Sequence, residues 1–254
     1  MVVVGNCLYV ESENTKLLID AGVSLKKIET GLETLNVSPS SLDGILVTHE
    51  HSDHIQSLGN LSKKFNLPVY ANSETFDAMP KQTDKISAEN INKFKVTEKF
   101  QIKDIEVNPF SIPHDAANPC GFNISNNSDK ISIATDIGHM TNDILKQLED
   151  SKFILLESNY DTEVLKCSKY PYLLKQRIAG PNGHLSNEIA SKVINYLLQG
   201  NLKTAMLGHL SKESNFPELA YQTVVDEIIR AGTDVSKLNL SVASRDKVGN
   251  LIHI

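Results

Sequence analysis

The chain has 254 residues, of which 40% are hydrophobic, so it is long enough to bury a sizeable core in one large or two small domains. Its net charge of −6 argues against a surface that is basic all over, but does not exclude a local basic groove for nucleic acid. Three scattered cysteines cannot form a disulfide framework. With no secretory signal and no apolar run of membrane-spanning length, the sequence predicts a cytoplasmic protein that does not contact a membrane.

Five short apolar runs predict strands, and each ends in a residue capable of metal or proton chemistry. In chain order they are Gly44–His49, Val107–His114, Lys130–Asp136, Phe153–Glu157 and Thr204–His209. Two prolines in the second run indicate an edge strand or a bend. Because strand ends project into loops at the edge of a sheet, we expect the five terminal side chains to lie where rigid scaffolds place catalytic groups.

Three segments have apolar residues at helical spacing, and each follows a residue that commonly begins a helix. Two helices are expected behind the capping residues Ser24 and Ser186, and a third runs from Pro217 to Gly232. Residues 81–104 are polar and predict a pair of strands with a loop, whereas alternation over residues 238–242 predicts a final strand. The pattern indicates a single α/β domain over residues 1–254, built from layered sheets and helices.

The run His49-x-His51-x-Asp53-His54 places three imidazoles and a carboxylate within six residues. On a strand, His49 and His51 would point to the same side, and a turn after Ser52 would direct Asp53 and His54 towards a neighbouring ion. The HExxH motif of zinc peptidases does not fit, because Asp53 stands where its second histidine is required. The alternative interpretation is a histidine-rich, solvated loop.

Four residues cannot complete two metal sites, so we expect further ligands from the strand ends. The first ion would bind His49, His51, His114 and Asp136, and the second would bind Asp53, His54, Asp136 and His209. A bridging carboxylate and imidazoles without thiolate suit two zinc or manganese ions about 3.5–4 Å apart. The alternatives are that His114 and Asp136 cap loops and that His209 is a buried, hydrogen-bonded histidine.

The six-residue run, followed by isolated His114, Asp136 and His209, resembles the five-motif signature of the metallo-β-lactamase superfamily. The resemblance covers essentially the whole chain. It implies an αββα four-layer sandwich with the metals at one edge, between the sheets. The run is typical of the whole superfamily and does not indicate a substrate.

Other segments resemble the nucleic-acid branch of that superfamily. The segments Glu157–Tyr160 and Gly183–Ser186, with Gly208-His209, look like those of tRNA 3′-processing ribonucleases, which implies that Glu157 and His184 assist proton transfer. The opening Gly5–Glu11, together with Leu17–Gly22 and His184–Asn187, is most similar to the YycJ (WalJ) group of bacterial proteins, regarded as DNA exonucleases. Only Met1 to Val4 precede Gly5, so we expect a short or altered first strand.

Between Glu157 and His184 lies the stretch Lys166–Arg177, which has four cations, two tyrosines and no acid. It predicts a phosphate-binding lip on which bases stack against tyrosine. The predicted substrate-binding residues are Lys169, Tyr172, Lys175 and Arg177. The alternative is an ordinary solvated helix face.

Two residues near the expected metals have predicted roles other than ligation. His184, oriented by Glu157, would donate a proton to the leaving oxygen, unless it only packs at the start of a helix. Asp20 would hydrogen-bond the metal-binding loop, unless it only forms a turn.

These features favour a metal-dependent phosphodiesterase acting on nucleic acid, most simply a 5′–3′ DNA exonuclease, with His184, Glu157 and Asp53 in catalysis. A first alternative is a thioester or lactone hydrolase resembling glyoxalase II. A second is a non-catalytic protein whose metals only stabilise the fold. A redox role resembling the di-iron flavoproteins fits less well. The sequence leaves open the native metal, DNA or RNA, strand polarity and oligomeric state.

Overall fold

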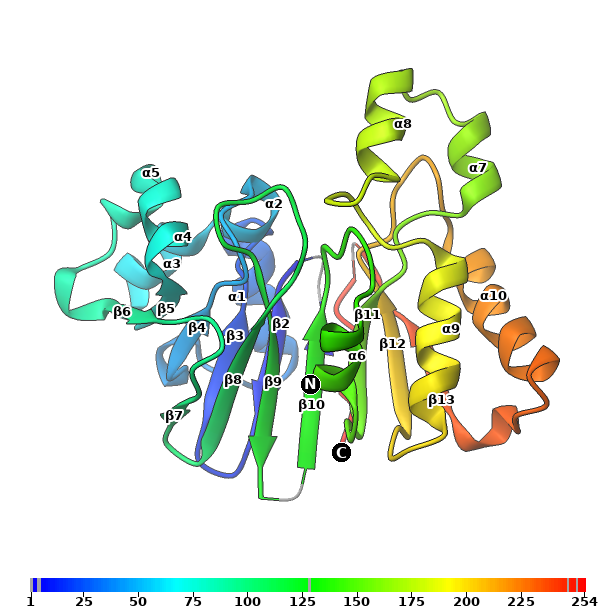
Figure 1. Ribbon diagram of the computed structural model, residues 1–254. Helices are drawn as coiled ribbons and strands as arrows, with labels where there is room; N and C mark the ends of the chain where they lie inside the picture. The colour runs from blue at the N-terminus through cyan, green and yellow to red at the C-terminus, as the bar shows by residue number, and fades with distance from the viewer. Residues whose placement is uncertain (1, 4–5, 128, 246, 250) are drawn as a thin grey trace. The chain divides into compact units, whose positions relative to one another are not determined.

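The computed structural model describes residues 2–3, 6–127, 129–245, 247–249 and 251–254 (Figure 1). The chain divides into two compact units. Unit 1 comprises Met1–Pro109, Ala116–Cys120 and Ser244–His253, and unit 2 comprises Phe110–Asp115, Gly121–Ala243 and Ile254. That residues 1–254 form a single domain stays a prediction.

Unit 1 contains a six-stranded sheet in the order β1-β2-β3-β4-β5-β6. Strands β1 to β3 are antiparallel, and β3 to β6 are parallel. Their bounds are Val2–Val3, Leu8–Glu11, Lys16–Ile19, Gly44–Leu46, Val69–Asn72 and Ile91–Phe94. Strand β1 is described over Val2–Val3, and Met1, Val4 and Gly5 lie outside the described residues, so the expected short or altered first strand stays a prediction.

Five helices accompany this sheet in unit 1. They are α1 (Leu25–Thr34), α2 (Ser52–Ile55), α3 (Leu58–Phe65), α4 (Ser73–Ala78) and α5 (Pro80–Thr83), with 3-10 turns at Pro39–Ser41 and Ala88–Asn90. The predicted cap of α1 is confirmed, because the Ser24 side chain accepts a hydrogen bond from the Lys27 amide. Apolar faces of α1 and α3 pack against strand residues such as Leu18 and Ile45, which makes the core of the unit.

The predicted strand pair within residues 81–104 is wrong. Two strands do form there, β6 and β7 (Phe100–Ile102), but they do not pair with each other. Strand β6 runs parallel to β5, and β7 is antiparallel to β8 (Ile105–Ser111). A buried apolar face specifies how a strand pairs with its neighbours. This segment is mostly polar, so its sequence does not indicate which strands it pairs with.

Unit 2 contains five strands in the order β13-β12-β11-β10-β9. Strands β10 to β13 are mutually parallel, and β9 is antiparallel to β10. The bounds from β9 to β13 are Cys120–Asn126, Asp129–Ala134, Phe153–Glu157, Thr204–Gly208 and Asn239–Val242. The predicted strands ending near Asp136, Glu157 and His209 are confirmed, and because they are parallel, their carboxyl ends share one edge.

Helices of unit 2 cover this sheet and also extend beyond it. They are α6 (Asn142–Leu148), α7 (Thr162–Cys167), α8 (Tyr172–Ile178), α9 (Asn187–Leu198) and α10 (Pro217–Arg230), with a 3-10 turn at Val235–Lys237. Helices α9 and α10 pack their apolar faces against β11 and β12, whereas α7 and α8 project beyond the carboxyl ends of these strands (Figure 1). No helix in the described part of the chain is long and apolar enough to cross a membrane.

The predicted limits of two of these helices are confirmed. Ser186 accepts a hydrogen bond from the Ile189 amide at the start of α9. Helix α10 begins at Pro217 and is followed by Gly232 at a φ of +72°, a left-handed conformation that suits glycine after a helix.

Gly22 allows the loop after β3 to lie against α2. A Cβ atom at this position would lie 1.6 Å from the Asp53 carbonyl oxygen. We expect Gly22→Ala to displace α2 and lower the free energy of unfolding by about 1–3 kcal/mol, as overpacking does. Chemical denaturation followed by circular dichroism measures this. Gly200→Ala is the matched control, because its nearest new contact would be an ordinary 3.5 Å. Equal stability of the two variants would contradict the interpretation.

Candidate metal centre

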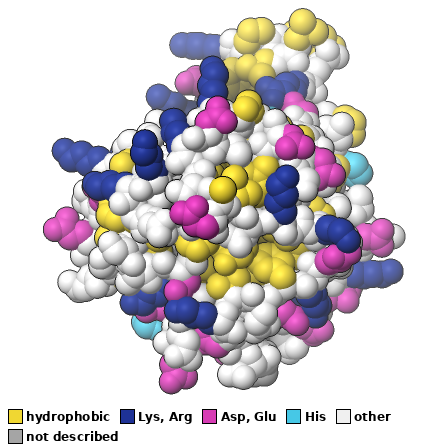
Figure 2. Space-filling model, turned by 90° about the vertical axis from the view of Figure 1, so that its left-hand side faces the viewer, with side chains coloured by type: hydrophobic (Ala, Val, Ile, Leu, Met, Phe, Trp, Pro, Cys, Tyr) yellow, Lys and Arg dark blue, Asp and Glu magenta, His cyan; other side chains and the backbone are white. Residues whose placement is uncertain are grey.

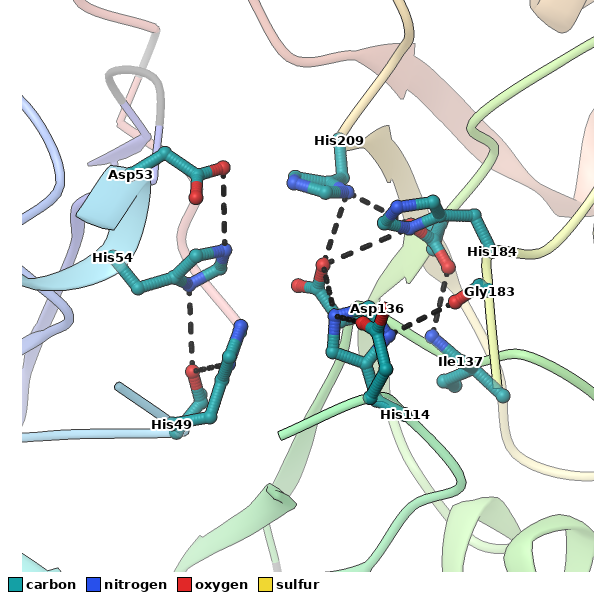
Figure 3. Close-up of polar contacts among 12 residues, drawn as sticks. His49, Asp53, His54, His114, Asp136, Ile137, Gly183, His184 and His209 are labelled. Atoms are coloured by element: carbon teal, nitrogen blue, oxygen red, sulfur yellow. Dashed lines mark hydrogen bonds and ion pairs between the residues drawn. The ribbon is translucent and has the colours of Figure 1, made fainter. Parts of the chain in front are cut away.

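In unit 1 the six-residue run lies in a turn and a short helix beyond the end of β4. Strand β4 ends at Leu46, and His51 is the N-cap residue of α2. The prediction that strand alternation aligns His49 and His51 is therefore wrong. The turn instead brings their ring centroids to 4.6 Å, and those of His49 and His54 to 4.2 Å. His49 and His54 are buried, His51 is half-buried and Asp53 is exposed. Figure 3 shows the His54 ring between Asp53 and His49.

The buried Asp20 carboxylate orients this cluster. Its Oδ1 atom accepts a hydrogen bond from the Thr48 amide at 2.9 Å, and its Oδ2 atom accepts from the Thr48 hydroxyl at 2.8 Å. Oδ2 also accepts from Nδ1 of His54 at 2.7 Å. The prediction that Asp20 hydrogen-bonds the metal-binding loop is confirmed.

The same contacts determine which ring nitrogens of two histidines carry a proton. His54 donates from Nδ1 to a carboxylate. The single hydroxyl proton of Thr48 goes to Asp20, so the Thr48 oxygen accepts from Nδ1 of His49 at 3.0 Å. In this tautomer Nε2 is the nitrogen with a lone pair, the form in which histidine binds zinc.

Asn6 contributes to this cluster in a way that sequence reasoning missed. Its side-chain amide donates to Oδ2 of Asp53 at 3.1 Å and lies 3.0 Å from Nε2 of His54. Its backbone carbonyl accepts from the Gly22 amide. Asn6 therefore connects the two predicted ligands to the loop after β3. The sequence offered one indication of this role, that Asn6 lies in the opening segment Gly5–Glu11, and that segment indicated only a resemblance to a family.

In unit 2 the corresponding centre is Glu157, fully buried at the end of β11. Its Oε1 atom accepts hydrogen bonds from Nδ1 of His184 at 2.9 Å and Nδ1 of His209 at 2.8 Å. Its Oε2 atom accepts from the amides of Ile137 at 2.8 Å and Leu185 at 2.9 Å. Burial raises the pKa of Glu157, but the charges and hydrogen bonds of the two imidazoles outweigh it, so the net shift is downward. The predicted pairing of Glu157 with His184 is present.

Asp136 lies beside this pair, in the loop after β10. Its Oδ1 atom is 3.6 Å from Nε2 of His114, 3.7 Å from Nδ1 of His184 and 3.5 Å from Nδ1 of His209. Ligand atoms of Asp136, Glu157, His184 and His209 all lie within 4.8 Å of one another, close enough to hold a metal ion. Carboxylate oxygens and imidazole nitrogens without thiolate fit zinc or manganese.

Gly183 connects His114 to His184. Its carbonyl oxygen accepts from Nδ1 of His114 at 3.0 Å, which leaves Nε2 of the neutral ring as the lone-pair nitrogen. A Cβ on Gly183 would lie 2.2 Å from the Arg177 carbonyl oxygen, so this close approach requires glycine. Burial lowers the pKa of His114 and exceeds the opposing effect of Asp136, which favours the neutral ring that ligates metal.

Three residues of the two clusters have left-handed backbones that non-glycine residues rarely adopt. The φ angles are +60° at Asp20, +60° at Asp136 and +54° at His209. Such conformations persist only where neighbouring contacts hold them, and they are enriched at functional sites. At His209 the carbonyl oxygen accepts a hydrogen bond from the Asn159 side chain at 2.8 Å.

Buried amides behind His209 were also missed by sequence reasoning. The Asn215 side chain donates to the Ser158 carbonyl at 2.8 Å and to Oδ1 of Asn187 at 2.8 Å. Asn187 also accepts from the Ser158 hydroxyl at 2.6 Å. These contacts join the loops after β11 and β12 to the start of α9, and so fix the backbone that carries His209.

The predicted substrate-binding residues have different surroundings. Lys169 and Tyr172 are exposed on the projection formed by α7 and α8. Nζ of Lys175 donates to the Lys166 carbonyl at 2.6 Å. Nε of Arg177 forms a 2.6 Å ion pair with Asp115, whose other carboxylate oxygen is 3.5 Å from Nε2 of His114. Asp115 was not predicted, and it ties Arg177 to a candidate ligand.

Sequence comparison identifies the family. Residues 15–209 match the family described as the beta-lactamase superfamily domain. The chain belongs to the metallo-β-lactamase superfamily. It is 37% identical over 233 residues to exodeoxyribonuclease WalJ of Streptococcus pneumoniae, covering 91% of this chain and 87% of that protein. It is also 37% identical over 233 residues to exodeoxyribonuclease YycJ of Bacillus anthracis, covering 92% of this chain and 88% of that protein.

Solved structures confirm the fold class. The metallo-β-lactamase fold protein YhfI of Bacillus subtilis matches with a TM-score of 0.68 at 16% identity, over 97% of both chains. The short form of human tRNase Z matches with a TM-score of 0.65 at 15% identity, over 97% of this chain and 92% of that one. At such identities the likeness shows the fold alone, and the predicted metallo-β-lactamase fold is confirmed.

Asp20→Asn tests whether the carboxylate orients His54. An amide offers one acceptor and places an NH2 group against donors, so His54 loses its fixed orientation. We expect zinc affinity to fall about 10- to 100-fold, the usual effect of such a change behind a metal ligand. Competition with a chromophoric chelator measures this, with the exposed Asp77→Asn as control. Unchanged affinity in a folded Asp20→Asn protein would show that the contact is not needed.

Proposed function

We propose that this protein is a metal-dependent phosphodiesterase that degrades DNA from an end. The observation that carries the proposal is the contact of Glu157 with both His184 and His209 beside Asp136, which joins a proton-transfer pair to candidate metal ligands. A metal site that only stabilises a fold needs no such pair. The relatives named exodeoxyribonuclease, at 37% identity over most of the chain, support DNA as the substrate.

We further propose that this protein binds two divalent ions, zinc or manganese. The ligands would be the seven predicted from the sequence, His49, His51, Asp53, His54, His114, Asp136 and His209. In each unit, histidines bonded through Nδ1 to protein oxygens present Nε2, which supports this assignment. Bound ions would supply an activated water and neutralise charge on the phosphate oxygens.

His184 would donate a proton to the oxygen of the leaving group. Its Nδ1 is held by Glu157, so the ring is oriented and its Nε2 is the nitrogen that can exchange a proton with substrate. A buried carboxylate at Nδ1 also stabilises the protonated ring, as in other paired general acids. His184 is half-buried, so the ring retains access to solvent.

Metal-reconstituted protein should shorten end-labelled DNA, and a chelator should abolish the reaction. We expect Asp53→Ala to reduce the rate at least about 100-fold, because it removes a charged metal ligand. Single- and double-stranded DNA and RNA, each with Zn²⁺ or Mn²⁺, establish the substrate, and Asp77→Asn is the control. Hydrolysis of small thioesters or lactones without cleavage of DNA would instead favour the hydrolase resembling glyoxalase II.

His184→Ala separates proton donation from metal binding. On DNA, whose leaving alkoxide needs a proton, we expect a loss of about 10²- to 10⁴-fold. On a p-nitrophenyl phosphodiester, whose leaving group needs none, the rate should change little. Exposed His139→Ala is the control. Equal losses on both substrates, together with lost metal, would identify His184 as a ligand instead.

A further inference from the structure

Helices α7 and α8 and the loops beside them form an arm, residues 161–182. The base of the arm is hydrogen-bonded to residues of the candidate site or next to it. At one end, the amide and hydroxyl of Thr162 donate to the Glu188 carboxylate at 3.2 and 3.1 Å. At the other end, the Ile178 carbonyl accepts from the His184 amide at 2.9 Å. The arm is therefore anchored at one end to Glu188 of α9 and at the other to His184, which Glu157 orients.

The arm has an apolar core of its own. Tyr160, Leu165 and Ile178 are buried together, with Tyr170 and Leu174 packed against them. Because Lys175 also donates to the Lys166 carbonyl, α8 is joined to α7 by a polar contact as well. The arm is thus packed without using the side chains at its tip.

The tip carries the two most exposed large hydrophobic side chains among the described residues, Tyr172 at 72% and Leu173 at 77%. They are adjacent at the start of α8, and the Tyr172 hydroxyl accepts from the Gln176 side chain at 2.9 Å, which orients the ring. Figure 2 shows hydrophobic side chains at the end of the projection with basic ones beside them. Exposed apolar groups that the fold does not need indicate a binding surface.

The charge around the tip complements a polyanion. The arm, residues 161–182, contains four cations and two acids, in a chain whose net charge is −6. One of the cations, Lys166, is paired with Glu163 at 2.7 Å. Lys169 forms no ion pair with any residue that the structure describes, and Lys175 bonds only a carbonyl there. Arg177, in contrast, is paired with Asp115 and serves to position the base of the arm.

Helix α8 separates the tip from the base of the arm. Its seven residues span about 10 Å. Nucleotides stacked as in one strand of duplex DNA advance about 3.4 Å each, so about three of them cover that length. Because the Ile178 carbonyl at the base of α8 accepts from the His184 amide, a strand that extends from His184 along α8 would reach the tip after about three nucleotides.

We propose that Tyr172 and Leu173 form a stacking surface for the bases of unpaired nucleotides, with Lys169 and Lys175 contacting the adjacent phosphates. The preferred substrate is then a DNA end with a single-stranded stretch of about three or more nucleotides. This rests on the proposed nuclease function and adds the form of its substrate. Stacking on an exposed aromatic ring tolerates any base, as degradation of DNA of arbitrary sequence requires.

The test measures binding separately from cleavage. Fluorescence anisotropy with chelator present gives the Kd for single-stranded, overhang and blunt DNA. We expect Tyr172→Ser/Leu173→Ser to raise Kd about 5- to 100-fold for DNA with unpaired ends and less than about 3-fold for blunt duplex. Tyr221→Ser/Ile229→Ser on α10, at residues 40% and 60% exposed, is the matched control and should change neither value. Hydrolysis of a p-nitrophenyl phosphodiester should be unchanged in the α10 control.

Several outcomes would overturn the stacking surface. These are an unchanged Kd, an equal loss on blunt and unpaired DNA, or an equal effect of the α10 control. Loss of a wild-type dimer, or of sedimentation with phosphatidylserine vesicles, in the tip variant without a change in DNA affinity would assign the tip to a second copy or to a membrane. If the tip binds unpaired DNA but no DNA is cleaved, the nuclease proposal fails and the binding surface stands.

Discussion

The rest of the unit 2 site depends on one buried carboxylate. Glu157 ends a strand that is buried along its whole length, and each of its oxygens accepts two hydrogen bonds. Two of the donors are the imidazoles of His184 and His209, and two are backbone amides at Ile137 and Leu185. A buried charge without such partners would be costly, so the loops that supply the donors are held where the carboxylate needs them. The same contacts orient both rings.

Asp20 has the corresponding role in unit 1, so a buried carboxylate orients histidines in both units. In each, a buried acid receives Nδ1 of a predicted ligand or proton carrier and thereby selects the ring nitrogen that faces outward. Backbone strain at Asp20, Asp136 and His209 is held by the same contacts and by the amide of Asn159.

The sequence allowed the ends of three strands and the limits of three helices to be predicted, because apolar runs and capping residues are local properties. The seven candidate ligands stay a prediction. The sequence did not reveal the positions of His49 and His51 correctly, because hydrogen bonds from Thr48 to the distant Asp20 hold the chain in a turn where strand alternation was expected. Asp115, Asn6 and the amides behind His209 were missed for the same reason: each acts through a partner far along the chain. Within residues 81–104 the sequence predicted two strands correctly, but not the strands with which they pair.

The arm leaves and re-enters unit 2 at one place. Tyr160 and Ser186 form a parallel β-bridge, and the Asn187 amide donates to the Tyr160 carbonyl. A segment whose two ends are already joined can change length or composition without moving the residues that flank it. The arm is therefore a module: the segment between Asp161 and Gly180 can be shortened or replaced while the residues around Glu157 keep their positions.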